Sequence, residues 1–212
     1  VSFALRPGRT LGLVGESGCG KTTTILEIME MTQPQHGRIT IQGKDVARLC
    51  SGDPTIYSAV AEQTRRLDAA GVPWQITPGV SAYAATAALV GRELTVPEVA
   101  QSVVLTRAQR DSTKMPEGEA LANFAATGAT LVLHLAIRHV RRLSDELVPH
   151  YGADCPVVVG SQVSGPHELV LRGTLADIAD QVEAHGLRQA AVIIVGRALA
   201  AQEFVESHLY SS

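Results

Sequence analysis

The alternation of hydrophobic and polar positions divides the chain into an N-terminal segment and two regions in which strands and helices alternate. Residues 11–29, LGLVGESGCGKTTTILEIM, read as a short apolar strand, a glycine-rich turn and a helix. Further along, a strand is predicted over residues 45–50, an amphipathic helix over 55–71, a second strand and turn over 72–81, and another helix over 82–91. This order is typical of a parallel α/β sheet.

The second half of the chain has an alternation of its own. Apolar runs predict strands over 102–107, 129–136, 155–162 and 189–196, and a strand followed by a helix over 168–186. Helical patterns cover residues 117–128 and 139–152. We therefore expect a mixed α/β domain over 100–212 that contributes most of the stability, a partial domain over 50–99, and a separate fragment over 1–49.

Composition and charge exclude several classes of function. The formal net charge is −3, with 18% charged and 45% hydrophobic residues, which gives no long-range attraction for nucleic acid. The apolar runs, such as the one around Leu131–Leu133, are far shorter than the ~20 residues of a membrane span. The first residues lack a signal-peptide pattern, and the three cysteines form no CxxC pair. We expect a cytoplasmic protein with neither a membrane span, a disulfide framework nor a metal site.

A phosphate-binding motif stands in the N-terminal fragment. Its loop carries Gly15, Gly18, Gly20, Lys21 and Thr22, with the spacing G-x-x-x-x-G-K-[ST] between a strand and a helix. In such a loop, backbone N–H groups converge on phosphate oxygens, the lysine neutralises charge and the threonine holds magnesium. The pattern predicts binding of MgATP.

Residues 1–49 also resemble the start of the ATP-binding subunit of ABC importers of the oligopeptide type. The resemblance ends there, because no Q-loop, LSGGQ-like signature or Walker B run follows. Phosphoryl transfer needs all of these parts together, so the fragment alone is not expected to hydrolyse ATP. An ATP-binding fragment of a peptide importer is nevertheless the alternative function.

Two loops of the next region are expected to face one crevice. The sequence SGDP at 51–54 follows the strand over 45–50, and residues 78–82 follow the second strand, which occupies the first part of 72–81. In open α/β sheets, ligands bind beyond the carboxyl ends of the strands. Gly-Asp-Pro on its own fits a simple turn equally well, so the loop needs further evidence.

Several spaced motifs together resemble the tetrapyrrole methylases. The resemblance covers residues 51–212 and is strongest to the branch that acts on precorrin-4; it rests on RLCSGDPTIYSAVAEQ, ITPGVSAYAATAALVGRELTVPEV, QSVVLTRA, HYGADCPVVV, LRGTLADIADQV and AAVIIVGRAL. It implies an α/β, two-domain methylase fold whose first domain is truncated and preceded by the P-loop strand-loop-helix fragment. The chain then reads as a chimera joined near GKDVARL, residues 43–49.

The resemblance also implies the chemistry. The enzyme would be a methyltransferase that uses S-adenosylmethionine to methylate precorrin-4 in cobalamin (corrin and porphyrin) biosynthesis, although truncation could leave it inactive. It would act as a homodimer on a small tetrapyrrole. The implied cofactor contacts are Ser51, Gly52, Asp53, Ile56, Ser81, Ala82 and Leu135.

Methyl transfer from a sulfonium needs alignment of donor and acceptor rather than a catalytic triad. His134 and Asp53 are both candidates for removing a proton from the acceptor, and the sequence does not rank them. A purely structural histidine at the end of a strand is the simpler interpretation of His134. Arg138, Arg141 and Arg142 could face acceptor carboxylates, but a solvated helix face is favoured.

Overall fold

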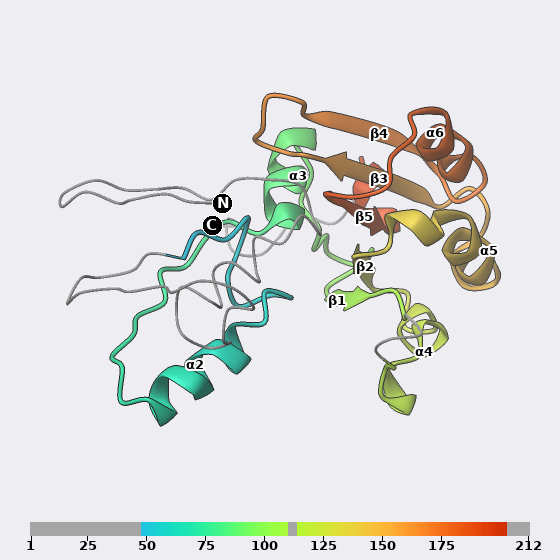
Figure 1. Cartoon of the computed structure of the whole chain (residues 1–212). Coiled ribbons are helices and arrows are strands. Elements are labelled where there is room, and N and C mark those ends of the chain that lie inside the picture. The colour runs from blue at the N-terminus through green and yellow to red at the C-terminus, as the bar shows by residue number, and fades with distance from the viewer. Residues whose placement is uncertain (1–47, 110–113, 203–212) are drawn as a thin grey trace, which may run out of the picture. The chain divides into compact units, whose positions relative to one another are not determined.

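The computed structural model describes residues 48–109 and 114–202 of the 212-residue chain (Figure 1). The chain divides into two compact units, residues 1–81 and 82–212. The predicted phosphate loop, Gly15 to Thr22, lies outside the described residues. Residues 82–99, which the sequence analysis grouped with the preceding region, belong to the second unit, and the predicted boundary at residue 99 stays a prediction.

The described part of the first unit is a loop, one helix and an irregular segment. Helix α2 spans Val60–Ala69, so it begins five residues later than predicted. The delay has a local cause, because Ala59 adopts a left-handed conformation with φ 58° and the Ser58 hydroxyl donates to the Pro54 carbonyl. These interactions hold residues 51–59 as a loop.

The strands predicted in this unit are not observed where it is described. Residues 48–50 and 72–80 are irregular, and residues 45–47 lie outside the described range. A strand is defined by ladder hydrogen bonds to a neighbouring strand, and no described residue offers one here. The hydrophobic pattern predicted extended backbone but could not supply a partner.

A five-stranded mixed sheet forms the centre of the second unit. Its strands lie in the order β1-β2-β5-β3-β4. The pair β1–β2 is parallel, whereas β2–β5, β5–β3 and β3–β4 are antiparallel. The bounds are Val103–Arg107 for β1, Thr130–His134 for β2, Pro156–Ser161 for β3, Leu169–Thr174 for β4 and Ala191–Val195 for β5. All five strands predicted in this half of the chain are confirmed.

Helices cover both faces of this sheet, with α3 on one side and α5 and α6 on the other (Figure 1). Their bounds are Ala82–Val90 for α3, Val140–Tyr151 for α5 and Ile178–Ala184 for α6. The helix predicted over 117–128 is split into a 3₁₀ turn, Glu117–Glu119, and the short helix α4, Leu121–Ala125. The split occurs because Ala120 has an extended backbone with ψ 139°. Two further 3₁₀ turns are Ile137–His139 and Arg197–Ala200.

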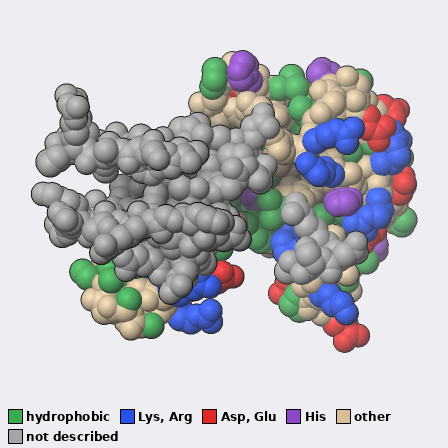
Figure 2. Space-filling view, viewed as in Figure 1, with side chains coloured by type: hydrophobic (Ala, Val, Ile, Leu, Met, Phe, Trp, Pro, Cys, Tyr) green, Lys and Arg blue, Asp and Glu red, His purple; other side chains and the backbone are tan. Residues whose placement is uncertain are grey.

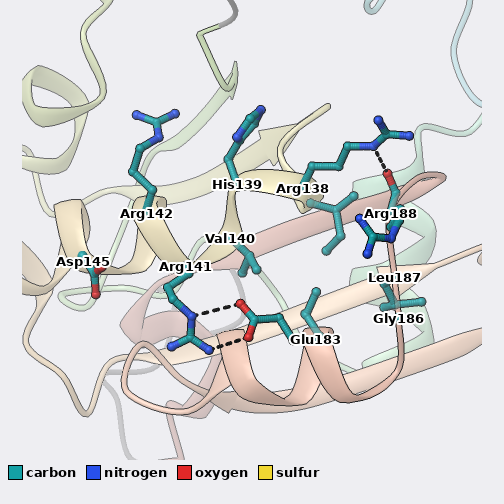
Figure 3. Close-up of a pocket in the computed structure, with 12 residues that line it drawn as sticks. Arg138, His139, Val140, Arg141, Arg142, Asp145, Glu183, Gly186, Leu187 and Arg188 are labelled. Carbon is teal, nitrogen blue, oxygen red and sulfur yellow. Dashed lines mark hydrogen bonds and ion pairs between the residues drawn. The ribbon is translucent and has the colours of Figure 1, made fainter.

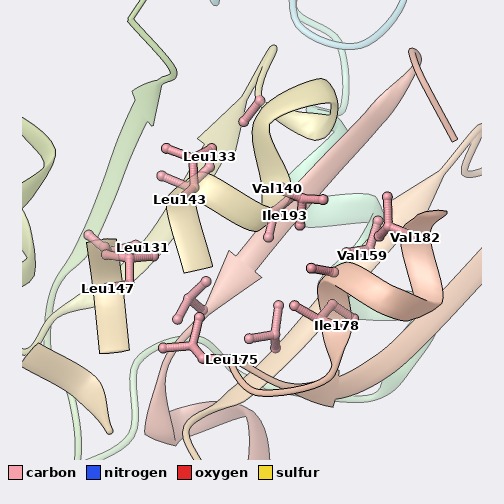
Figure 4. Close-up of a cluster of buried hydrophobic side chains, with 14 of the residues drawn as sticks. Leu131, Leu133, Val140, Leu143, Leu147, Val159, Leu175, Ile178, Val182 and Ile193 are labelled. Atoms are coloured by element: carbon pink, nitrogen blue, oxygen red, sulfur yellow. The ribbon is translucent and has the colours of Figure 1, made fainter. Parts of the chain in front are cut away.

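Alternate residues of each inner strand enter two different hydrophobic cores. On β2, Leu131 and Leu133 pack toward α5 and α6 in the larger core, which Figure 4 shows. Val132 points to the opposite face and packs with Ala87 and Val90 of α3. A strand with period-two side chains and apolar residues on both faces is expected between two helical layers. This arrangement explains why the strand sequences are continuously apolar rather than alternating.

Helix α3 approaches β3 closely at one point, where glycine is required. A Cβ added to Gly160 would overlap the Thr86 hydroxyl and would lie 2.8 Å from Thr86 Cγ2 and 2.9 Å from Val163 Cγ2. Thr86 is fully buried, and its hydroxyl donates to the Ala82 carbonyl at 2.7 Å. The threonine cannot easily move aside, so a side chain at Gly160 would push α3 off the sheet.

We predict that Gly160→Ala destabilises the protein by about 1–3 kcal/mol, the usual cost of overpacking a core. Gly118→Ala is the matched control, because a Cβ at Gly118 meets nothing within 4 Å. Urea unfolding of the full chain, followed by circular dichroism, measures both variants. Equal unfolding midpoints for the two would show that α3 does not pack on β3 as described.

Candidate functional site

Two loops of the first unit meet through backbone contact. The carbonyl oxygen of Gly52, in the SGDP loop, lies so near Gly79 that a Cβ on Gly79 would overlap it. Gly79 is the central residue of the Pro-Gly-Val turn. The two loops that the sequence predicts to share a crevice are therefore adjacent. Only glycine at position 79 allows this approach.

A short hydrogen-bond network fixes the shape of the SGDP loop. The Asp53 carboxylate oxygen Oδ1 accepts a hydrogen bond from the Thr55 backbone N–H at 2.8 Å and another from the Thr55 hydroxyl at 2.7 Å. The Ile56 N–H donates to the Asp53 carbonyl at 3.3 Å. Both Thr55 donors stabilise the ionised carboxylate, the backbone N–H most, so the pKa of Asp53 is lowered.

Arg48 supports the same loop from its other end. Its guanidinium donates to the Ser58 carbonyl at 3.1 Å and to the Cys50 sulfur at 2.8 Å. The same Ser58 carbonyl also accepts from the Gln63 side chain of α2 at 3.5 Å. The loop is therefore held at both ends, which leaves its tip to present backbone groups.

The predicted contact residues of this unit differ in accessibility. Ser51 and Gly52 are exposed, Asp53 and Ile56 are partly buried, and Ser81 is buried at 8% relative exposure. The backbone of Ser51 and Gly52 is thus available to a ligand, while Ile56 offers a partial apolar surface. Sequence reasoning did not single out Thr55 and Gly79, although the TPGV turn contains the signal for the latter.

The second unit supplies the remaining predicted residues. Ala82 is the first residue of α3 and is exposed. Leu135 follows directly on β2, has a left-handed backbone with φ 54°, and is 47% exposed. A left-handed conformation is strained for a non-glycine residue, and such strain is concentrated at functional sites. The strain places a large apolar side chain at the surface beyond the strand.

His134, the last residue of β2, is partly buried at the same end of the sheet. Its ring makes an edge-to-face contact with Tyr83 of α3, with centroids 6.4 Å apart and an interplanar angle of 90°. Burial lowers the pKa of His134 below its ordinary value of 6.5. The neutral imidazole is therefore the form present at pH 7.

A groove on the opposite helical face carries the predicted arginine cluster. It has a volume of about 620 Å³ and is lined by the end of α6 and by residues 137–142 (Figure 3). Arg141 binds Glu183 at 2.7 Å and Asp180 at 2.5 Å, and Arg138 donates to the Arg188 carbonyl at 2.9 Å. Figure 2 shows the same mixture of basic and acidic side chains over this part of the surface. Because these charges are matched locally, the expected solvated face describes the cluster well.

Residues 48–109 and 114–202 contain neither a metal-binding cluster nor a membrane-spanning helix. No group of three or more His, Cys, Asp or Glu side chains there could hold a metal ion. No helix in that part of the chain is both long and apolar enough to cross a membrane.

We predict that Thr55→Val raises the pKa of Asp53 toward its ordinary value of 3.8, because one of the two Thr55 hydrogen bonds is removed while the backbone N–H remains. The depressed pKa stabilises the native loop above pH 3.8, and this stabilisation is lost as the pH falls through the native pKa. Carboxyl-carbon NMR titration measures the shift. Thr64→Val, on α2, is the control and should leave Asp53 unchanged.

An Asp53 pKa that does not move in Thr55→Val would mean that the hydroxyl hydrogen bond is absent in solution.

Comparison with known proteins assigns the fold to a family. The sequence model of the family described as Tetrapyrrole (Corrin/Porphyrin) Methylases matches residues 40–179. A solved structure of a cobalamin biosynthetic enzyme, cobalt precorrin-4 methyltransferase, superposes with a TM-score of 0.67 at 36% identity, covering 70% of this chain and 62% of that one. The match begins at residue 40, three residues before GKDVARL, so this segment falls within the methylase part.

Curated relatives agree with this assignment. The precorrin-4 C(11)-methyltransferase of Rhodococcus erythropolis is 58% identical over 170 residues, which cover 80% of this chain and 68% of the relative. That of Mycobacterium tuberculosis is 47% identical over 202 residues, covering 91% and 79%. The latter alignment reaches upstream of residue 40, into the segment predicted to be a foreign fragment, and no match here supports that fragment's origin in an ABC importer. The chain belongs to the tetrapyrrole (corrin/porphyrin) methylases.

Proposed function

We propose that this chain is an S-adenosylmethionine-dependent methyltransferase that methylates precorrin-4 at C11 in cobalamin biosynthesis. The observation that carries the proposal is the 58% identity over 170 residues to an enzyme named precorrin-4 C(11)-methyltransferase. The solved structure with a TM-score of 0.67 is also named for precorrin-4 methylation. Identity at this level over most of the chain favours the same substrate class over a distant member of the fold.

The loop geometry of the first unit fits the methyl donor. Ser51 and Gly52 present exposed backbone, and Gly79 lets the neighbouring turn approach without a side chain in between. Exposed backbone carbonyls can accept hydrogen bonds from the charged amino group of the cofactor, and Ile56 adds an apolar contact. In the second unit, the exposed Leu135 side chain offers an apolar surface to a flat adenine base. The family resemblance implies each of these residues, and also Asp53, Ser81 and Ala82, as a cofactor contact.

The cofactor supplies a methyl group bonded to a sulfonium, and the neutral thioether that remains after transfer is a good leaving group. The protein has to align the acceptor carbon with that methyl and keep water away, and fixed loops achieve this best. The network of Asp53, Thr55 and Arg48 holds the loop before any ligand arrives. Less conformational entropy is then lost on binding.

We predict that the purified chain binds S-adenosylmethionine and converts precorrin-4 to a product heavier by one methyl group. Isothermal titration measures binding, and mass spectrometry of an anaerobic reaction measures transfer. Gly79→Ala should weaken binding by about tenfold or more, since the added methyl displaces the Gly52 carbonyl. Gly118→Ala, in open space, is the matched control.

The absence of heat at millimolar cofactor, or an unmethylated acceptor, would contradict the proposal. Equal affinity of Gly79→Ala and Gly118→Ala would instead remove the role given to the two loops while leaving the methyltransferase activity in place.

Three finer features remain proposals. We infer a homodimer from the family resemblance. The phosphate-loop pattern at Gly15, Gly20, Lys21 and Thr22 supports nucleotide binding as a second candidate function, and a chimeric origin of residues 1–49 rests on the same pattern. Protection of Lys21 from amine labelling by MgATP is the expected result if the loop is functional, and unchanged labelling would exclude it.

A further inference from the structure

The groove between the start of α5 and the end of α6 has two ends that differ in charge. At one end, Arg141 is matched by Asp180 and Glu183 of α6, at 2.5 Å and 2.7 Å. On the same helix, Arg142 is matched by Glu146 at 3.5 Å. That end is an ordinary solvated face, because each of its arginines has a carboxylate partner.

The other end carries positive charge without a matching carboxylate. It is formed by Arg138 and His139, just before α5, and by Arg188, in the loop between α6 and β5. All three residues are exposed, and none of them forms an ion pair with any residue that the structure describes. The remaining carboxylate of the lining, Asp145, lies further along α5 on the Arg142 side (Figure 3). We call the first three residues the basic end of the groove.

One guanidinium of the basic end is held in a fixed orientation. Arg138 Nε donates to the Arg188 carbonyl at 2.9 Å, and the two terminal nitrogens of Arg138 point away from this bond (Figure 3). The carbonyl orients the guanidinium but leaves its charge in place. A planar fork of two N–H donors matches the two oxygens of one carboxylate. The terminal nitrogens are therefore prepared to bind such a group.

The second guanidinium, that of Arg188, lines the same groove. Its side chain makes no hydrogen bond or ion pair within the described part of the chain. Two like charges in one groove repel each other, and a concave surface concentrates their field. An anion at this end relieves the repulsion, and a ligand with two carboxylates can meet one guanidinium with each.

The surface between the charged residues is apolar. Ile137, Val140 and Val182 form a buried floor, with 4%, 4% and 1% exposure, and Leu187 is partly buried beside them. Leu187 and the aliphatic stems of the arginines supply the surface that a ligand can contact. The volume of about 620 Å³ lies within the range of about 300–1,000 Å³ that is usual for small-molecule sites. The groove thus suits an anion with a hydrocarbon part better than an inorganic ion.

We propose that the basic end of the groove binds an organic anion that carries two or more carboxylates on an apolar body. Arg138 and Arg188 each hold one carboxylate, and Leu187 contacts the apolar body. The site goes beyond the proposed methyl transfer, because it shares no residue with the implied cofactor contacts. Macrocyclic and linear polycarboxylates share this chemistry, so the test includes one of each.

The two probes are octanedioate, a linear dicarboxylate, and uroporphyrin, a macrocycle with carboxylates on its peripheral arms. Each is titrated into the full chain while the NMR signals of the arginine Nε–H groups are recorded. At least one probe should shift the signals of Arg138 and Arg188, and the probe that does so identifies the ligand as linear or macrocyclic. Unshifted signals with both probes at millimolar concentration would overturn the proposal. Equal shifts with octanedioate and inorganic phosphate would also overturn it, because the apolar body would then contribute nothing.

A variant tests the contribution of the second guanidinium. Arg188→Gln should weaken the affinity for the bound probe by about tenfold or more, because one charged hydrogen-bonding group is lost. Arg172→Gln is the matched control, since Arg172 is exposed on β4, does not line the groove and carries the same charge. Unchanged urea unfolding midpoints show that both variants fold. Equal affinity of the two variants for the probe would contradict the proposal.

Two further measurements separate this site from the proposed function. The affinity for S-adenosylmethionine should be the same in Arg188→Gln and in the parent, whereas a parent that binds no S-adenosylmethionine would overturn the proposed function and leave the groove site in place. The affinity for the probe should fall as the ionic strength rises, because exposed charges are screened. An affinity that does not change with salt would overturn the role of the two guanidiniums.

Discussion

Burial of strand β5 on both of its faces is the constraint on which the second unit depends. Val192 and Ile194 pack toward α3, and Ile193 and Val195 pack toward α5 and α6, each with 2% exposure or less. Each such side chain contributes about 1.5–3 kcal/mol when it leaves water. Because β5 pairs with β2 on one side and β3 on the other, the same burial fixes the direction and register of β2. The position of His134 at the end of β2 therefore follows from a hydrophobic requirement.

Polar interactions, rather than hydrophobic burial, organise the loop over residues 51–59 in the first unit. The loop is shaped by hydrogen bonds from Arg48 and Thr55 and by the contact of Gly52 with Gly79, with little apolar burial. Hydrogen bonds near the surface contribute little net free energy each, about 0.5–1.5 kcal/mol, but they are directional. A loop built this way can hold backbone groups toward a ligand while remaining exposed. The two units therefore suit different tasks, a precise polar loop in one and a rigid strand end in the other.

The sequence predicted the strands of the second unit well because the apolar residues that identify each strand are consecutive in the chain. Runs such as AVIIV and TLVLH are buried on both faces, and their apolar length alone identifies them as strands. The start of α2 at Val60 could not be predicted, since the hydrophobic pattern continues through residues 55–59 and takes no account of the Ser58 and Ala59 backbone. The pairing of Arg107 with His134 could not be predicted either, because it depends on the register between two strands whose paired residues lie 27 positions apart in the sequence. The loops at 51–54 and 78–82 were predicted to be neighbours, and the contact of Gly52 with Gly79 supports this.

Family membership and the geometry of the chain constrain different parts of the reaction. In the proposed function the SGDP loop holds the sulfonium donor, which is the same for every acceptor, so the loop is informative about the cofactor and not about the acceptor. A substitution at the end of a strand can change charge or basicity without disturbing the core. His134 occupies such an end on β2, and the residues of the adjacent strand β5 on the same face, Val192 and Ile194, are apolar residues that the fold needs in any case. Burial lowers the pKa of His134, so the packing that stabilises the sheet also affects the proton affinity of a group at its edge.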